Sequence, residues 1–256
     1  MVSCFAEGER VVIESMGNKQ KALRFHNSFD EYADRYEEEC RKGLALAGEG
    51  PDYFSESRIE YTTSWLSAVG ASIPLRVVDF GCGVGTSTPH FRRHLPGAAL
   101  LGLDVSAASI RRARQLHGAD STFALIDEYI PAQDQDLVYC NGVFHHIEPN
   151  EREKWARSVS DLLAPGGYFA LWENNPWNPG AMMVMRRIPF DRDAIPLASP
   201  EARRILSSAD FEIIGTRYRF YFPRGLSRMR GLERYFERLP LGAQYCVLAR
   251  KRFPVN

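Results

Sequence analysis

The sequence contains no apolar run long enough to cross a membrane, no C-x-x-C pair, no internal repeat and no low-complexity tract. Its first residues, MVSCFAEGERVV, lack the basic and apolar regions of a secretory signal peptide. The five cysteines are scattered and odd in number, which argues against a disulfide framework and against a zinc site. These absences predict a cytoplasmic protein that holds no metal, inserts stably into no membrane and binds no nucleic acid.

The charge of the chain is balanced overall but unevenly distributed. Residues 1–70 hold 8 basic and 13 acidic side chains, whereas residues 201–256 hold 12 basic and 5 acidic ones. We interpret the basic C-terminal segment as a solvated, arginine-rich face; contact with an anionic substrate, carrier or membrane surface is the alternative. The 256 residues suffice for one well-buried α/β domain with a cap, or for two small domains.

The chain begins with predicted helices and then alternates between strands and helices. Ser28 and Glu31 form a capping box that predicts a helix over 28–43, and a second helix is expected over 55–70. Further helices are expected over 86–94, 106–118 and 150–167, and strands over 75–80, 99–105, 122–127, 136–140, 168–174, 211–222 and 244–253. This alternation predicts a parallel sheet with helices on both faces and a ligand beyond the carboxyl ends of its strands.

One more helix is expected between the last two strands. Apolar residues recur at helical spacing in RGLSRMRGLERYFERL, at Leu226, Met229, Leu232, Phe236 and Leu239. Such a stripe is typical of a buried helix face, and a membrane or partner surface is the alternative.

The stretch VVDFGCGVGTST places Gly81, Gly83 and Gly85 directly after a strand that ends near Asp79. Alternating glycines let a ligand approach the backbone closely. A dinucleotide fingerprint needs a third glycine where Thr86 stands, and a phosphate loop needs a lysine that is missing here. The loop alone therefore disfavours both ligands without identifying another.

Acidic and small residues follow the next strands. Asp104 ends the second strand, 23 residues after Gly81, where a carboxylate can accept both hydroxyls of a ribose. Asp127 ends the third strand and could accept from an adenine amino group, and Asn141 and Gly142 follow the fourth. The ribose contact is equally suited to NAD and to S-adenosylmethionine.

Together, VVDFGCGVGTST, GLDVS, ALIDE, DLVYCNGVFHHI and APGGYFALWE make residues 75–250 resemble the class I S-adenosylmethionine-dependent methyltransferases. The resemblance implies a Rossmann-like α/β fold whose mostly parallel sheet has seven strands, the last antiparallel and inserted between the fifth and sixth. It implies S-adenosylmethionine as cofactor and S-adenosylhomocysteine as product. It also implies a helical lid over residues 1–70, a cofactor-binding methyltransferase domain over 71–256, and a helical insertion between the last two strands.

The resemblance further implies which residues contact the cofactor. Those expected around its methionyl part are Gly81, Cys82, Gly83 and Gly85, with Asp79 also counted as cofactor-binding; those around its adenosine are Asp104, Val105, Asp127 and Glu128; those beneath its sulfonium are Asn141 and Gly142. From the lid, Tyr36, Phe54 and Arg58 are expected to close over the donor, with Arg58 paired to the methionyl carboxylate. The alternative makes Arg58 a surface charge and makes Tyr32 and Tyr36 ordinary packing residues.

Methyl transfer from a sulfonium needs alignment above all, and a base only where the acceptor must lose a proton. His145 and His146 follow the fourth strand, and Glu173 ends the fifth. A carboxylate beside an imidazole strengthens it as a base. We predict that His146, oriented by Glu173, is the base; His145 is the second candidate, and simple packing of both histidines is the alternative.

The acceptor is the least defined part of the prediction. Residues 174–197 are rich in proline, methionine and aromatic residues, which suits an adaptable apolar wall. We predict methylation of a small, partly hydrophobic acceptor, at a hydroxyl oxygen of a natural product or modified sugar. The alternatives are an N- or C-methyltransferase acting on an amine or a quinone-like ring and, more distantly, an NAD-dependent oxidoreductase, which Thr86 disfavours.

Overall fold

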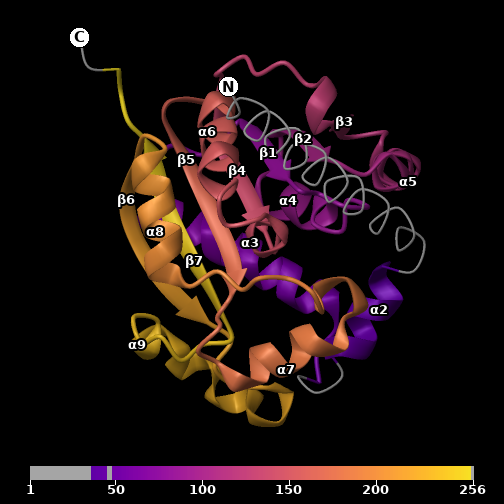
Figure 1. Cartoon of the computed structure of the whole chain (residues 1–256), viewed down its shortest axis with the longest axis vertical. Helices are drawn as coiled ribbons and strands as arrows, with labels where there is room; N and C mark the ends of the chain where they lie inside the picture. The colour runs from indigo at the N-terminus through magenta and orange to yellow at the C-terminus, as the bar shows by residue number, and fades with distance from the viewer. Residues whose placement is uncertain (1–35, 45–47, 255–256) are drawn as a thin grey trace, which may run out of the picture.

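The computed structural model describes residues 36–44 and 48–254, and Ser28, Glu31 and Tyr32 lie outside this part of the chain. Seven strands form one sheet in the order β3-β2-β1-β4-β5-β7-β6 (Figure 1). Their bounds are β1 Arg76–Phe80, β2 Ala99–Asp104, β3 Thr122–Leu125, β4 Gln135–Asn141, β5 Leu163–Asn174, β6 Phe211–Arg219 and β7 Gln244–Lys251. Strands β1 to β5 are parallel, and β7 runs antiparallel between β5 and β6. The predicted fold class is confirmed, including the inserted last strand.

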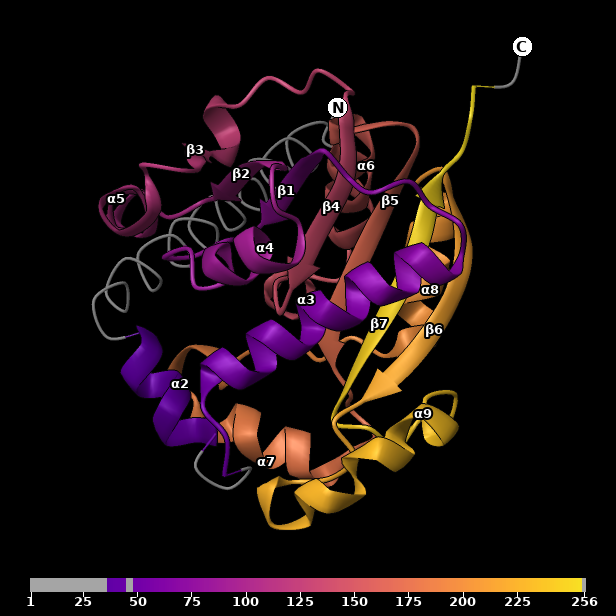
Figure 2. The same ribbon diagram turned by 180° about the vertical axis from the view of Figure 1, so that it is seen from behind.

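Helices cover both faces of the sheet. The helices are α2 Tyr36–Leu44, α3 Pro51–Ala68, α4 Thr88–His94, α5 Ala107–His117, α6 Arg152–Leu162, α7 Pro179–Arg187, α8 Ser199–Ser208 and α9 Glu233–Phe236. Short 3-10 turns are η1 Ile126–Glu128, η2 Phe144–His146, η3 Pro189–Asp191 and η4 Arg224–Leu232. Figures 1 and 2 show α6 and α8 on one face and α3 and α4 on the other.

Each face of the sheet has its own apolar core. Val78 points into the cluster that contains residues of α6 and α8, and its neighbour Val77 points into the cluster that contains residues of α3 and α4. Successive side chains of a strand alternate between faces. The strands read as continuous apolar runs because both of their faces are buried.

Several element boundaries differ from the expected ones, chiefly at the start of α3 and where α6 meets β5. Helix α3 starts at Pro51 rather than at residue 55, because proline is well suited to the first turn of a helix. Helix α6 ends at Leu162, and β5 begins at Leu163, where the prediction continued the helix to residue 167. Pro165 cannot continue a helix, and Gly166 has a φ of +81°, which glycine adopts readily.

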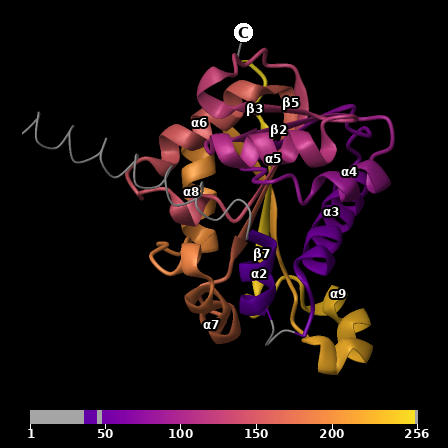
Figure 3. The same cartoon turned by 90° about the vertical axis from the view of Figure 1, so that its right-hand side faces the viewer.

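The segment between β6 and β7 contradicts the prediction of one helix with a buried face. Turn η4 and helix α9 replace that helix, and the five stripe residues are 38–48% exposed. The segment lies beyond the carboxyl ends of the parallel strands, away from the helices that cover the sheet (Figures 1 and 3). Its anchor is polar: the buried Glu233 carboxylate accepts the backbone N–H groups of Phe220 and Tyr221 at 3.2 and 3.0 Å.

Helix α3 is fixed to the sheet along its second half. Ile59 and Leu66 are buried in the core cluster, and the Trp172 indole N–H donates to Thr62 Oγ1 at 2.9 Å. None of the described helices combines the length and the apolarity needed to cross a membrane. The division into a lid over residues 1–70 and a domain over 71–256 stays a prediction.

Candidate active site

A cavity of about 820 Å³ lies at the carboxyl ends of the parallel strands. The loop after β1 and the end of β2 form one side of it, and the turns η2 and η3 form another. Residues from α2 and from the first half of α3 also line it. The cavity therefore occupies the position that open α/β sheets use for ligands.

The glycine loop adopts a backbone conformation that other residues resist. Gly81, Gly83 and Gly85 have φ values of +78°, +53° and +82°. A Cβ atom on Gly81 would overlap the Val143 side chain, whereas a Cβ on Gly83 would meet nothing within 4 Å. Gly83 lines the cavity, so its missing side chain leaves room there for a ligand to contact the backbone.

Asp104 joins the glycine loop to the end of β2. Its Oδ2 accepts the Gly83 N–H at 2.8 Å, and its Oδ1 accepts the Ser106 N–H at 2.8 Å. Each oxygen of an ionised carboxylate can accept more than one hydrogen bond. Asp104 and Val105 both line the cavity, so the carboxylate can hold the loop and a ligand at the same time.

Asp79 is a buried acid whose Oδ2 has no hydrogen-bond partner among the described residues. Burial, and next the charge of Asp104, raise the pKa of Asp79 to about 7, against the opposing effect of Arg58. Arg58 is only 8% exposed and donates to Tyr139 Oη and to Gln244 Oε1, both at 3.1 Å. The alternative of a surface charge at Arg58 is therefore wrong. The unpartnered Oδ2 of Asp79 could accept a hydrogen bond from a cationic group of a ligand.

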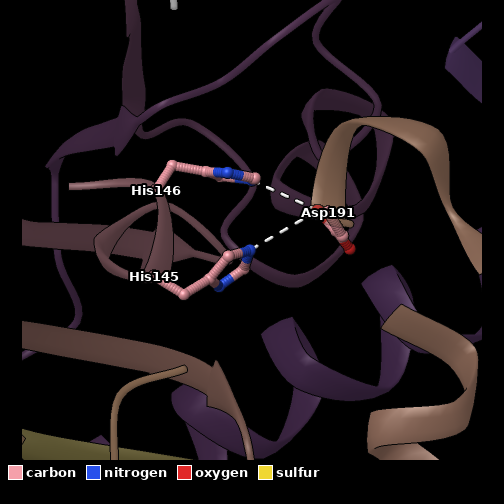
Figure 4. A group of neighbouring side chains, drawn as sticks. All are labelled: His145, His146 and Asp191. Carbon is pink, nitrogen blue, oxygen red and sulfur yellow. Dashed lines mark ion pairs between the residues drawn. The ribbon is translucent and has the colours of Figure 1, made fainter. Parts of the chain in front are cut away.

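The two histidines after β4 meet an acid that the sequence did not single out. His145 Nδ1 lies 2.5 Å from Glu173 Oε2, and Glu173 Oε1 accepts the Phe144 N–H at 2.7 Å. Asp191 Oδ1 lies 3.2 Å from His146 Nε2 and 3.5 Å from His145 Nε2 (Figure 4). We call His145, His146 and Asp191 the histidine–aspartate cluster.

The pairing within this cluster differs from the expected one. Glu173 contacts His145, and the partner of His146 is Asp191. Residues 144–146 form a 3-10 turn, in which neighbouring side chains point about 120° apart. The ring of His145 therefore points towards the end of β5, where it is 2% exposed.

The cluster holds unequal charges near neutral pH. Burial lowers the pKa of His145, but the carboxylates of Glu173 and Asp191 outweigh it and raise that pKa to about 10. Burial, and next the charge of His145, hold the pKa of His146 below its usual value. Burial opposes ionisation of Asp191, yet the two histidines bring its pKa down to about 2. His145 is then the cation, Asp191 the anion and His146 the neutral ring.

The cavity brings together most of the residues expected from the sequence. Its lining includes Phe54, Arg58, Asp79, Gly81, Cys82, Gly83, Asp104, Val105, Asn141, Gly142, His145 and His146. Gly85, Asp127 and Glu128 lie outside this lining, and Glu173 is reached through His145. Tyr36 begins α2, and its side chain is not among those described. The roles of all these residues stay predictions.

Asp191 is the main residue that sequence reasoning missed. It lies in IPFDRDAIPL, within the segment that the sequence predicts to be an apolar wall. A charged residue inside such a wall was the available signal, because an acid at a buried apolar position needs a partner. Its distance from the histidines along the chain, 45 residues beyond His146, hid the partnership.

Comparison with known proteins supports the class that the sequence predicts. Residues 78–169 match the family model described as a methyltransferase domain. This match, the sequence relatives and the shared fold support a class I S-adenosylmethionine-dependent methyltransferase with S-adenosylmethionine as its cofactor, as the sequence predicts.

Among sequence relatives, the chain is similar to trans-aconitate 2-methyltransferases. It is 33% identical to the one from Rhodopseudomonas palustris (strain BisB18), over 54% of this chain and 53% of that protein. It is 36% identical to the one from Mycobacterium tuberculosis (strain ATCC 25177 / H37Ra), over 49% of this chain and 48% of that protein. The chain thus spans about half the length of the curated relatives it matches.

Solved structures share the fold. An S-adenosylmethionine-dependent methyltransferase from Mesorhizobium loti has a TM-score of 0.53 and 22% identity, over 75% of this chain and all of that one. The magnesium protoporphyrin IX methyltransferase from Synechocystis PCC 6803, with bound S-adenosylhomocysteine, has a TM-score of 0.53 and 19% identity, over 82% of this chain and 86% of that one. At these identities the likeness concerns the fold alone.

Proposed function

We propose that the protein transfers the methyl group of S-adenosylmethionine to an oxygen atom of a small acceptor bound at the histidine–aspartate cluster. One observation carries the proposal: a single cavity joins the glycine loop and Asp104 to His145, His146 and Asp191. Its volume of about 820 Å³ lies in the upper part of the range of ligand sites, which suits two neighbouring small molecules.

The donor residues fit the cofactor. Asp104 would accept the ribose hydroxyls while it holds the Gly83 N–H. The orphaned Oδ2 of Asp79 would accept from the cationic amino group of the methionyl part. Gly83 would let this part lie against the backbone, and the buried Arg58 would meet its carboxylate.

The chemistry of the cofactor leaves the protein with positioning and protection. The sulfonium supplies an already activated methyl group. Asn141 ends β4 and Gly142 follows it; both line the cavity, so they would help to hold the two ligands in line. Phe54, Ile188 and Phe190 line the cavity and would exclude water from the reacting atoms.

The charges of the cavity limit the acceptor. The carboxylates among its described lining residues are Asp79, Asp104, Glu148, Glu151 and Asp191, against the permanent cations Arg58 and Lys154. The relatives' name gives trans-aconitate, a tricarboxylic acid, as acceptor. In the metal-free protein these five carboxylates outnumber Arg58, Lys154 and the protonated His145, so three further carboxylates would be repelled. We therefore propose a partly apolar acceptor with a hydroxyl or a single carboxyl group.

The proton of a hydroxyl acceptor would pass to the cluster. In the metal-free protein, His146 is the neutral ring, and Asp191 holds that ring by its Nε2. The base role expected of His146 then depends on Asp191, while Glu173 acts through His145. A carboxylate acceptor needs no base, so it would depend on the cluster for binding alone.

Methyl transfer can be measured directly. The full chain is incubated with methyl-labelled S-adenosylmethionine and single acceptors from a panel of phenols, sugars, monocarboxylic acids, amines, quinones and trans-aconitate. We expect acceptor-dependent S-adenosylhomocysteine and label on oxygen, located by mass spectrometry, with little turnover in the control Asp104→Ala. Label on nitrogen or carbon would overturn the oxygen proposal, and failure of the folded protein to bind S-adenosylhomocysteine would overturn the donor site.

A further inference from the structure

Three ligand atoms of the histidine–aspartate cluster meet in a geometry that suits a metal ion. One ligand atom from each of the three residues lies within 4.8 Å of the other two. The distances from Asp191 Oδ1 to the two Nε2 atoms are 3.2 and 3.5 Å (Figure 4). In a tetrahedral site with bonds of about 2.0–2.1 Å, neighbouring ligand atoms are roughly 3.3–3.4 Å apart.

A second observation supports the site independently. His145 Nε2 is buried and has no hydrogen-bond partner among the described residues. The opposite ring nitrogen lies 2.5 Å from Glu173, whose other oxygen is held by the Phe144 N–H. A carboxylate behind a ligating histidine is the usual support of a metal site, because it fixes the ring with its far nitrogen towards the ion.

Hydrogen bonding alone accounts for only part of this arrangement. Asp191 can bind His146 and so hold η3 against η2. His145 Nε2 lies 3.5 Å from the same Asp191 oxygen, close enough for an ion pair but without a hydrogen bond. Glu173 fixes the His145 ring so that Nε2 faces Asp191. A metal ion between the two rings and Asp191 would account for this orientation.

We infer that His145, His146 and Asp191 bind one divalent transition-metal ion of the zinc type, with Glu173 orienting His145. Two imidazoles and one carboxylate suit Zn²⁺, Co²⁺ or Fe²⁺ better than Mg²⁺ or Ca²⁺, which take mainly oxygen ligands. Three protein ligands leave a coordination position open, as in catalytic zinc sites. The expectation of no metal rested on the spacing of the cysteines, and that argument cannot detect a site made of two histidines and an aspartate.

The inference goes beyond the proposed function, because ion binding does not require methyl transfer. Binding releases the proton that His145 carries between its two carboxylates. With the ion bound, His146 is a ligand and no longer a base. An acceptor hydroxyl at the open position would then lose its proton to solvent, because a bound cation lowers the pKa of a coordinated oxygen.

The test uses the full chain after dialysis against a chelator. Zn²⁺ is added in a calorimeter, and Co²⁺ is followed by the visible absorption of its tetrahedral complexes. We expect one equivalent of either ion to bind and the melting temperature to rise. Asp191→Asn and His146→Gln should abolish the cobalt spectrum. Glu173→Gln should weaken binding 10–100-fold, as is usual for the support of a ligating histidine.

His90→Gln is the matched control. His90 is also buried and lies 2.9 Å from an acid, Asp52, but it lies outside the cavity and in no group of three described ligands. This variant should bind the ion like the wild type. S-adenosylhomocysteine binding by Asp191→Asn should be unchanged, which separates loss of the ion from loss of the fold or of the donor site. Absence of stoichiometric binding, or cobalt binding that persists in Asp191→Asn, would overturn the inference.

Discussion

The donor end and the acceptor end of the cavity are built in different ways. The donor end uses backbone: three glycines of one loop, with Asp104 accepting the N–H of one of them, Gly83. The acceptor end uses side chains from three separate segments, namely η2, the end of β5 and η3. The glycine loop of the donor end is contiguous in the sequence, so a motif predicts it. The acceptor end is assembled from distant segments and forms only after the chain has folded.

The largest expected effect falls on the acceptor end alone. With a hydroxyl acceptor, His146→Ala should lower kcat by about 10²–10⁴, the usual loss when a positioned base is removed, and loss of a metal ligand would act in the same direction. Affinity for S-adenosylhomocysteine should stay within about twofold of the wild type. Steady-state kinetics with an acceptor found in the panel described above, together with calorimetry, check both parts. Equal losses of donor binding and kcat would mean that the two ends are not separable.

A smaller effect should appear at the donor end as a pH dependence. The pKa of Asp79 is about 7, so its carboxylate ionises as the pH rises through neutrality. Because the ionised form attracts the donor's amino group, affinity for S-adenosylhomocysteine should increase up to about tenfold from pH 6 to pH 8. Calorimetry across this range measures it. The variant Asp79→Asn should lose this dependence, and a flat wild-type profile would exclude Asp79 from the contact.

A third prediction concerns the expected lid, whose described part consists of α2 and α3. The first half of α3 lines the cavity, while Ile59 and Leu66 in its second half are buried in the core. Addition of S-adenosylhomocysteine should therefore slow amide exchange in α2 and in the first turns of α3, with little change in the last turns. Mass spectrometry of exchanging peptides resolves these regions. Protection restricted to residues after 75 would leave α2 and α3 as scaffold.

The smallest effect is expected at exposed residues of η4, which lie outside the lining of the cavity. Leu226→Gln and Leu232→Gln should each change the free energy of unfolding by less than about 0.5 kcal/mol, because both side chains are exposed. Leu206→Ala, on the buried face of α8, should cost about 2–5 kcal/mol. Denaturant titration compares them. A large loss at Leu226 would restore the buried helix face predicted from the sequence.

The sequence predicted the sheet well because strand burial, turn glycines and caps are local signals. Ser106, for example, caps α5 at the start of the helix expected over 106–118, with its Oγ accepting the Ser109 N–H. The stripe at Leu226 and Leu232 misled because periodicity indicates an apolar face without saying whether another element covers it. His146 was given the wrong carboxylate for a related reason: the direction of each ring depends on the turn at η2, and Asp191 reaches it through tertiary packing.

The most direct test of the central claim is calorimetric titration of S-adenosylhomocysteine into the wild type, Asp104→Ala and Asp191→Asn. The account predicts one binding site in the wild type. It predicts a loss of about 3 kcal/mol in Asp104→Ala, because two hydrogen bonds to a charged acceptor are worth at least about 1.5 kcal/mol each. Asp191→Asn should bind like the wild type. No binding by the folded wild type, or equal affinity in Asp104→Ala, would contradict the account.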